Sequence, residues 1–164
     1  MTREESVKLY NTYARKLFNV SFRILHDSGE AEEIMQDTIL KYITSVFKPL
    51  TEVQTGAWLT KTCVRKSIDI LRKKKREQLF LEEYEVEESV VDPDSAPAPE
   101  GTTLEKIRNA ISELPGNSRL ILDLILLEGL DYEEVAEYTG AREGTIRVQY
   151  SRARARLAEI LRSM

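Results

Sequence analysis

The chain lacks both the paired cysteines that stabilise small secreted proteins and the long apolar runs that span membranes. A single cysteine among 164 residues excludes an internal disulfide and fits a reducing cytoplasm. Seven glycines, five prolines and 7% aromatic residues, beside 32% charged residues, are typical of a soluble, helix-rich protein. No apolar run approaches the roughly 20 residues that cross a bilayer, and the chain does not start with a signal-peptide pattern. We therefore expect a cytoplasmic protein.

The sequence also lacks the side-chain combinations that carry catalysis or bind metal. Its one histidine, His26, lies beside Asp27 at an expected helix end, where a structural role is favoured over metal ligation. Cys63 has no second cysteine with which to share a metal ion. No glycine-rich phosphate loop and no nucleophile paired with a base can be recognised. We expect no enzyme, no bound metal and no cofactor.

Charge is segregated along the chain. Residues 77–105 contain ten acids and no base, whereas the whole chain has 24 bases and 28 acids. Without those ten acids, 24 bases remain against 18 acids, so the rest of the chain carries +6 although the whole carries −4. Residues 79–103 combine most of these acids with three prolines and few large apolar groups, a composition that does not offset the entropy of ordering. We expect this segment to be a flexible acidic linker.

The apolar spacing predicts an all-α fold of two small helical domains. Residues 1–46 carry apolar side chains every three or four positions, with a restart near Asp27, which indicates two helices. Pro49 interrupts the pattern, and a third helix is expected from about Thr55 into Lys75. We expect one helical domain at residues 1–78 and, after the linker, a second at 104–164.

The second domain is expected to end in a helix-turn-helix. A helix beginning at Leu104 and an apolar helix from Ser118 to Glu128 precede it. Asp131 can cap a short helix, and Gly140 can end that helix by adopting a positive φ. The following helix has apolar or aromatic side chains at positions 146, 150, 153 and 157, four arginines, and no acid between residues 144 and 158. A basic second helix of this kind enters the DNA major groove, whereas the alternative for this stretch alone is a solvated helix pair.

Two stretches of the first domain carry distinctive motifs. The first is AEEIMQDTIL at residues 31–40, and the second is AWL at residues 57–59 followed by SIDILR at 67–72. The first resembles the DAEDLVQETFL stretch of bacterial RNA polymerase sigma factors, and the second resembles the AWL…LDLLR helix of the same family.

The second domain resembles the same family. LP at residues 114–115, with EGLDYEEVA at 128–136, resembles LP…EGLSYEEIAE, and GTIR at 144–147 with SRAR at 151–154 is similar to GTVKSRLHRAR. The match covers nearly the whole chain, and the two domains follow the family's order. The small size resembles the extracytoplasmic-function (ECF) group, so we expect a sigma factor that binds core RNA polymerase and directs promoter-specific initiation.

The resemblance implies three sets of contact residues. The second helix would offer a docking face to the β′ coiled coil of core polymerase, with Glu32, Glu33, Gln36 and Asp37. The third helix and the loop before it would open the minus-ten element, with basic contacts from Lys61, Arg65, Lys66, Arg72 and Lys73. The helix after Gly140 would read the minus-thirty-five element, with Thr145, Arg147, Gln149, Ser151 and Arg152. The family also implies an anti-sigma factor, often membrane-anchored, as a further partner.

Departures from the family pattern leave alternatives open. Arg65 stands where the family often has asparagine, and Val148-Gln149 where it has Ser-Arg. Because these positions would meet bases, the promoter sequence cannot be predicted. One alternative is an autonomous helix-turn-helix regulator that binds DNA without polymerase. Another is a sigma-like protein that docks on polymerase without initiating.

Overall fold

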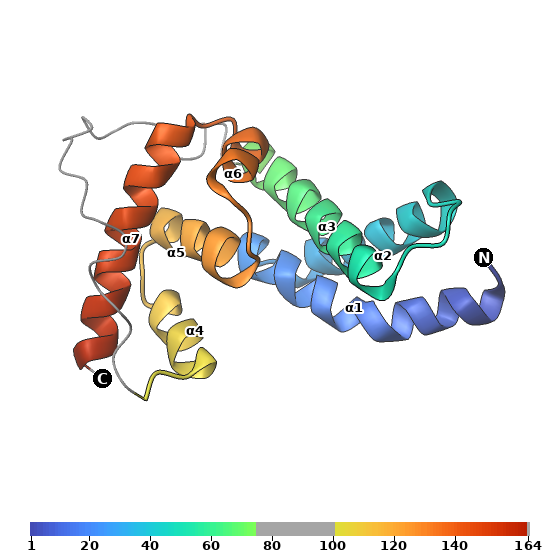
Figure 1. Ribbon diagram of the computed structural model, residues 1–164, viewed down its shortest axis with the longest axis horizontal. Coiled ribbons are helices and arrows are strands. Elements are labelled where there is room, and N and C mark those ends of the chain that lie inside the picture. Colours follow the sequence, from blue (N-terminus) through green and yellow to red (C-terminus); the bar gives the residue numbers. More distant parts are fainter. Residues whose placement is uncertain (75–100, 164) are drawn as a thin grey trace. The chain divides into compact units, whose positions relative to one another are not determined.

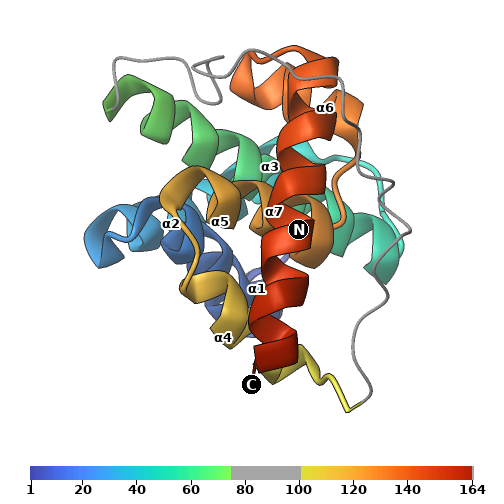
Figure 2. The ribbon, with the colours of Figure 1, turned by 90° about the vertical axis from the view of Figure 1, so that its left-hand side faces the viewer.

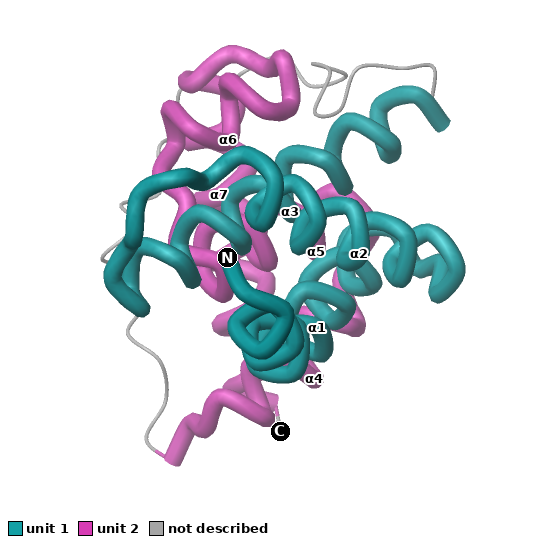
Figure 3. Tube along the Cα trace, turned by 90° about the vertical axis from the view of Figure 1, so that its right-hand side faces the viewer, with its two compact units in different colours: residues 1–74 teal, residues 75–164 magenta. Residues whose placement is uncertain are grey.

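The computed structural model describes residues 1–74 and 101–163, which fall into two compact units. Unit 1 comprises residues 1–74 and unit 2 residues 75–164, coloured separately in Figure 3. The predicted linker at 79–103 lies outside the described residues except for its last three.

Unit 1 is a bundle of three helices, α1 (Arg3–Leu25), α2 (Ser28–Ser45) and α3 (Glu52–Lys74), each of which contacts the other two (Figure 1). The spacing of its apolar residues places one stripe of each helix in a shared core. That core contains Leu17, Val20, Ile24, Ile34, Met35, Ile39, Leu59, Val64 and Ile68.

The first half of α1 contributes little to this core. Val7 and Tyr10 lie at the helical spacing of the buried stripe, yet they are 51% and 42% exposed. Buried residues of the helix begin at Leu17. The apolar periodicity therefore predicted the helix but not the extent of its buried part.

Side-chain caps set the helix boundaries of unit 1. Thr2 and Glu5 form a capping box, and Asp27 accepts a 3.0 Å hydrogen bond from the backbone N–H of Glu30. The third helix begins three residues before the predicted Thr55. Its start is fixed by a reciprocal cap, in which the N–H of Gln54 donates to Thr51 Oγ1 and the N–H of Thr51 donates to Gln54 Oε1.

Buried hydroxyl groups tie the three helices of unit 1 together. Ser67 Oγ of α3 donates to the backbone oxygen of Cys63 at 2.8 Å and shares a 2.9 Å hydrogen bond with Ser21 Oγ of α1. The Tyr42 hydroxyl of α2 shares a 2.9 Å hydrogen bond with Thr55 Oγ1 of α3. Because buried polar groups are costly without partners, these bonds fix the register of the helices against one another.

Unit 2 consists of α4 (Leu104–Ser112), α5 (Gly116–Leu122), a π-helical segment η1 (Asp123–Leu127), α6 (Tyr132–Thr139) and α7 (Glu143–Ser163). Figures 1 and 2 show α7 running the length of this unit, and α4, α5 and α6 all contact it. The core includes Ile121, Leu122, Leu124, Val135, Ile146 and Ala153.

The predicted helix from Ser118 to Glu128 differs from the observed structure in two ways. It begins earlier, at Gly116, and its second half is π-helical. There the N–H of Glu128 bonds the carbonyl of Asp123, five residues back, at 2.9 Å. Gly129 then takes a positive φ of 73°, which ends the segment as predicted. Among all the described helices, none is long and apolar enough to cross a membrane.

Candidate nucleic-acid and protein interfaces

One side of α2 is acidic and exposed. Glu32, Glu33, Gln36 and Asp37 are all exposed, whereas the interleaved positions 31, 34, 35, 38 and 39 are buried against α1 and α3. The helix thus gathers the four predicted residues on its solvent side, which we call the acidic face of α2. Leu40, next along this side, is 59% exposed and was not among the predicted residues.

The outer side of the second half of α3 is mostly basic, with one exposed acid, Asp69. Lys61, Arg65 and Lys73 are exposed and Lys66 and Arg72 are half-buried, while Leu59, Val64, Ile68 and Leu71 turn into the core. We call these five predicted residues the basic face of α3. Lys74, just beyond them, forms an ion pair with Glu30 of α2 at 2.5 Å. The remainder of the basic run, Lys75 and Arg76, lies outside the described residues.

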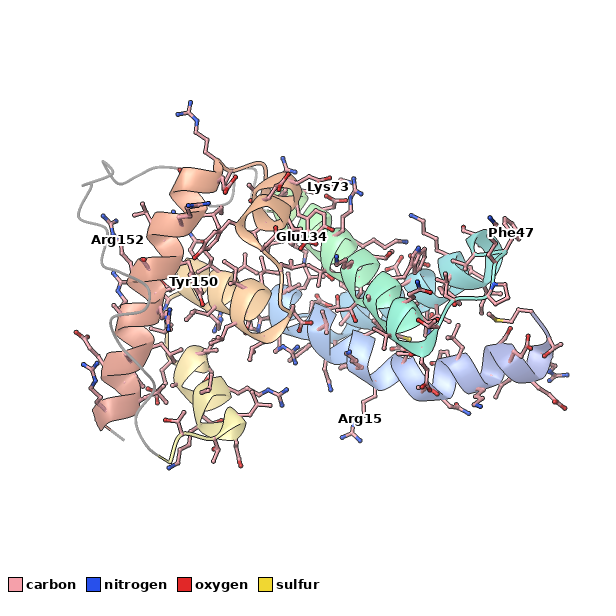
Figure 4. The ribbon with its side chains drawn as sticks, in the orientation of Figure 1. Arg15, Phe47, Lys73, Glu134, Tyr150 and Arg152 are labelled. Atoms are coloured by element: carbon pink, nitrogen blue, oxygen red, sulfur yellow. The ribbon has the colours of Figure 1, made fainter. Side chains whose placement is uncertain are left out.

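The connection between α2 and α3 presents large apolar side chains to solvent. Phe47 is 88% exposed and Val53, in the first turn of α3, is 82% exposed (Figure 4). By contrast Trp58 is half-buried, with its ring edge-on to Tyr42 at 5.3 Å between centroids. Packing therefore accounts for Trp58 but not for Phe47.

Helices α6 and α7 form the predicted helix-turn-helix. Asp131 caps α6 by accepting a 2.7 Å bond from the N–H of Glu134, whose side chain bonds back to the N–H of Asp131. Gly140 ends α6 with φ 76°, the left-handed conformation that glycine adopts without a steric penalty. Helix α7 then begins at Glu143 and packs against α6.

The predicted contact residues of α7 do not all share one row. Arg147 is exposed, Gln149, Ser151 and Arg152 are half-buried, and Thr145 is buried at 7% exposure. Residues three or four positions apart are neighbours on a helix, whereas residues two apart are not. Arg147 and Ser151 therefore lie in one row and Gln149 and Arg152 in a second. Figure 4 shows Arg152 on the outer side of α7 and Tyr150 turned toward the rest of unit 2.

Comparisons with known proteins agree with this division into two units. Residues 9–77 match the family model for sigma-70 region 2, and residues 104–157 match that for sigma-70 region 4. The ECF RNA polymerase sigma factor SigF of Caulobacter vibrioides is 32% identical over 137 residues, covering 82% of this chain and 72% of the relative. The chain belongs to the sigma-70 family of RNA polymerase sigma factors, in its ECF group. Factors of this family bind core RNA polymerase and direct promoter-specific transcription initiation.

Other similar proteins are also RNA polymerase sigma factors. RNA polymerase sigma factor SigV of Bacillus subtilis is 26% identical over 141 residues, covering 86% of this chain and 81% of the relative. ECF RNA polymerase sigma factor SigE of Mycolicibacterium smegmatis is 25% identical over 160 residues, covering 94% of this chain, but the chain spans only 60% of that relative. A solved structure of the sigma factor RpoE with the anti-sigma factor NepR from Bartonella quintana matches with a TM-score of 0.51. The identity is 26%, over 97% of this chain and 98% of that one.

Arg147 of this sigma factor is held by side chains from two elements. Its Nη2 donates a 2.9 Å hydrogen bond to Glu143 Oε1, one turn earlier on α7. Its guanidinium carbon lies 5.2 Å from the centre of the Tyr132 ring of α6. Tyr132 in turn meets the ring of Tyr150 edge-on, with centroids 5.8 Å apart. Burial raises the pKa of Tyr150, an effect that Arg154 opposes and Tyr132 reinforces.

Several residues at these surfaces were missed by sequence reasoning. Glu143 could have been found, because an acid four residues before an arginine on a helix is a standard pair. Phe47 could also have been found, as a large aromatic beside the helix-breaking Lys48-Pro49. Tyr132 gave no such signal, because its contact with Arg147 depends on how α6 turns into α7.

Proposed function

We propose that this sigma factor divides promoter recognition between its two units. Unit 1 docks on core polymerase through the acidic face of α2 and captures the minus-ten element with α3 and the loop before it. Unit 2 reads the minus-thirty-five element with α7. In this proposal the functional domains are residues 1–78 and 104–164, joined by the acidic linker at 79–103. The observation that carries it is that each matched family region bears its own exposed, charged helix face.

The acidic face of α2 suits a protein partner better than DNA. Glu32, Glu33 and Asp37 would repel phosphates, but they can steer and orient an encounter with a basic protein surface. The neighbouring Leu40 adds apolar area that such a contact would remove from water. This combination fits a docking surface for the β′ coiled coil of core polymerase.

The basic face of α3 and Phe47 fit capture of a melted strand. Positively charged side chains along α3 can track phosphates, and an exposed aromatic ring can stack on an unpaired base. Unstacking a base costs a few kcal/mol, which such contacts must offset. Unit 1 therefore offers both kinds of contact that opening the minus-ten element requires.

Helix α7 suits reading of duplex DNA. Arg147, Ser151 and Arg152 lie on the side of α7 opposite Tyr150 and Ala153, so they can face a groove while those two residues stay in the core. Gln149 lies at the edge of this side. Thr145 is only 7% exposed, so its side chain has little surface to offer DNA. At the first turn of α7, backbone N–H groups remain a means of holding a phosphate.

The proposal also covers enzymatic activity, cellular location and a further protein partner. The sigma factor is a specificity subunit and not itself an enzyme, and it acts in the cytoplasm, with polymerase and the chromosome. The RpoE match is a complex with an anti-sigma factor. We include an anti-sigma factor among the partners of this chain on that ground.

The test is reconstitution with purified bacterial core polymerase, followed by transcription of fragmented genomic DNA from the source organism. We expect stable association and discrete new transcripts, from which a shared promoter motif can be derived. Association without transcripts would mean that the protein docks but does not initiate. DNA binding without association would mean an autonomous regulator. Either result would refute the proposal.

Charge-reversal variants test the division between the units. Glu32→Lys with Glu33→Lys should abolish association with polymerase, whereas Arg147→Glu with Arg152→Glu should preserve association but weaken promoter-specific transcription. The matched control, Glu137→Lys with Glu159→Lys, changes two exposed acids of unit 2 and should leave association intact. Loss of polymerase binding in the arginine variant would contradict the division.

A further inference from the structure

The side chain of Arg147 is more constrained than that of an ordinary surface arginine. It is 61% exposed, yet it is hydrogen-bonded to Glu143 Oε1 and lies over the Tyr132 ring. An exposed arginine normally samples many rotamers, and ordering it on DNA costs entropy. Contacts from two elements reduce that freedom before DNA arrives.

The two contacts leave a hydrogen-bonding edge of Arg147 available. A guanidinium group has five N–H donors in one plane, and Glu143 contacts only Nη2. Tyr132 covers a face of the plane and no N–H. Donors therefore remain for the paired acceptors O6 and N7 of a guanine, a contact that depends on the orientation of the plane.

Tyr132 is itself fixed from the core. Its ring packs edge-on against Tyr150, which is only 8% exposed, and the capping box at Asp131 sets the start of α6 just before it. A continuous series of contacts thus runs from the core of unit 2 to the guanidinium of Arg147. The helix-turn-helix determines where that arginine points.

We propose that Glu143 and Tyr132 are positioning residues that set the base specificity of Arg147 in the minus-thirty-five element. This inference rests on the proposed function of α7. Glu143 would have a second effect, because a carboxylate one turn from Arg147 repels phosphates and disfavours contacts that base readout does not compensate. Positioning by Glu143 therefore raises discrimination between bases while lowering affinity for DNA of arbitrary sequence.

The opposite signs of these effects distinguish positioning from a merely structural role. Glu143→Gln should reduce discrimination at one base pair and strengthen binding to arbitrary DNA. A residue needed only for folding would weaken binding to both kinds of DNA. Glu143 is exposed, so this substitution is not expected to disturb the core.

The experiment uses the holoenzyme and the strongest promoter from the genomic transcription test, carrying every single substitution in its minus-thirty-five element. Wild type should discriminate at the position read by Arg147 by about 5- to 150-fold, and Arg147→Ala should remove that preference. Glu143→Gln and Tyr132→Leu should each reduce it by about 2- to 5-fold. Tyr132→Phe keeps the ring face and should retain it.

Two controls complete the design. Glu159→Gln makes the same change in net charge on the same helix, 16 residues and roughly 24 Å away, and should leave discrimination unchanged. In an Arg147→Ala background, Glu143→Gln should cause no further loss of discrimination, because the two residues act through one contact.

Three results would overturn the inference. If Arg147→Ala removes a base preference that Glu143→Gln and Tyr132→Leu both preserve, positioning is refuted while the sigma function stands. If Arg147→Ala alters no preference, the inference falls together with the role of Arg147. Absence of promoter-specific initiation by the wild-type holoenzyme would refute the proposed function itself, and the inference with it.

Discussion

Replacing Phe47 with alanine tests whether the loop between α2 and α3 captures an unpaired base. The side chain is 88% exposed, so its removal leaves no cavity and should change the free energy of unfolding by less than about 0.5 kcal/mol. Stacking of a base on an aromatic ring contributes about 1–3 kcal/mol. At about 1.4 kcal/mol per factor of ten, the equilibrium constant for forming the open complex should fall by about 5- to 150-fold.

The assay follows 2-aminopurine fluorescence in the minus-ten element of a promoter bound by holoenzyme. A second template, already unpaired in that element, separates stacking from melting. Stacking predicts that Phe47→Ala weakens binding to the unpaired template as well, by a similar factor. Phe47→Tyr keeps the ring and should behave as wild type, and Val7→Ala removes an exposed apolar side chain elsewhere in unit 1.

Two observations would refute the reasoning. One is an open complex with Phe47→Ala that matches wild type in population and lifetime on both templates. The other is a loss of affinity for core polymerase in this variant before any DNA is added, since the loop would then belong to the docking surface.

Three further predictions concern stability. Asp131→Ala removes the cap of α6 and should lower the free energy of unfolding of unit 2 by about 1 kcal/mol in urea titrations, with a smaller loss for Asp131→Asn. Ser67→Ala leaves the buried hydroxyl of Ser21 without this partner and should cost about 1–3 kcal/mol, part of which the added Ser21→Ala should restore. Burial raises the pKa of Tyr150 above 10.0, so its neutral form is favoured in the folded state. This stabilisation is present below pH 10 and is lost as the pH rises through the folded pKa, so the stability of wild type relative to Tyr150→Phe should decline in urea titrations as the pH is raised past 10.

Local signals predicted the helix starts well because capping is a local interaction. Thr2 with Glu5 and Asp131 with Glu134 could be found from residue type and spacing alone, since each cap spans only three residues. The same spacing occurs at Thr51 and Gln54, where the start of α3 was placed too late. The capping pair at Thr51 and Gln54 was therefore visible in the sequence. The predicted start at Thr55 instead followed from the helix-breaking Pro49.

Features that depend on packing between elements were not predictable. The exposure of Val7 depends on how far α2 and α3 extend along α1. The apolar spacing within α1 carries no information about that. The π-helical turn at Asp123–Leu127 depends on how an apolar segment fits its neighbours. Among the candidate site residues, helical periodicity was enough to gather the acidic face of α2. The contact between Tyr132 and Arg147 required the geometry of the turn at Gly140.

In the proposed function, the packing of unit 1 couples docking on polymerase to capture of the melted strand. Its acidic face lies on α2 and its basic face on α3, and the buried bond between Tyr42 and Thr55 fixes these two helices against each other. Phe47 lies on the connection between the same helices. If polymerase holds α2 as we propose, it also fixes where Phe47 and the basic side chains would meet DNA. The binding energy of docking would then orient the melted strand, because the three elements belong to one packed core and cannot be placed independently.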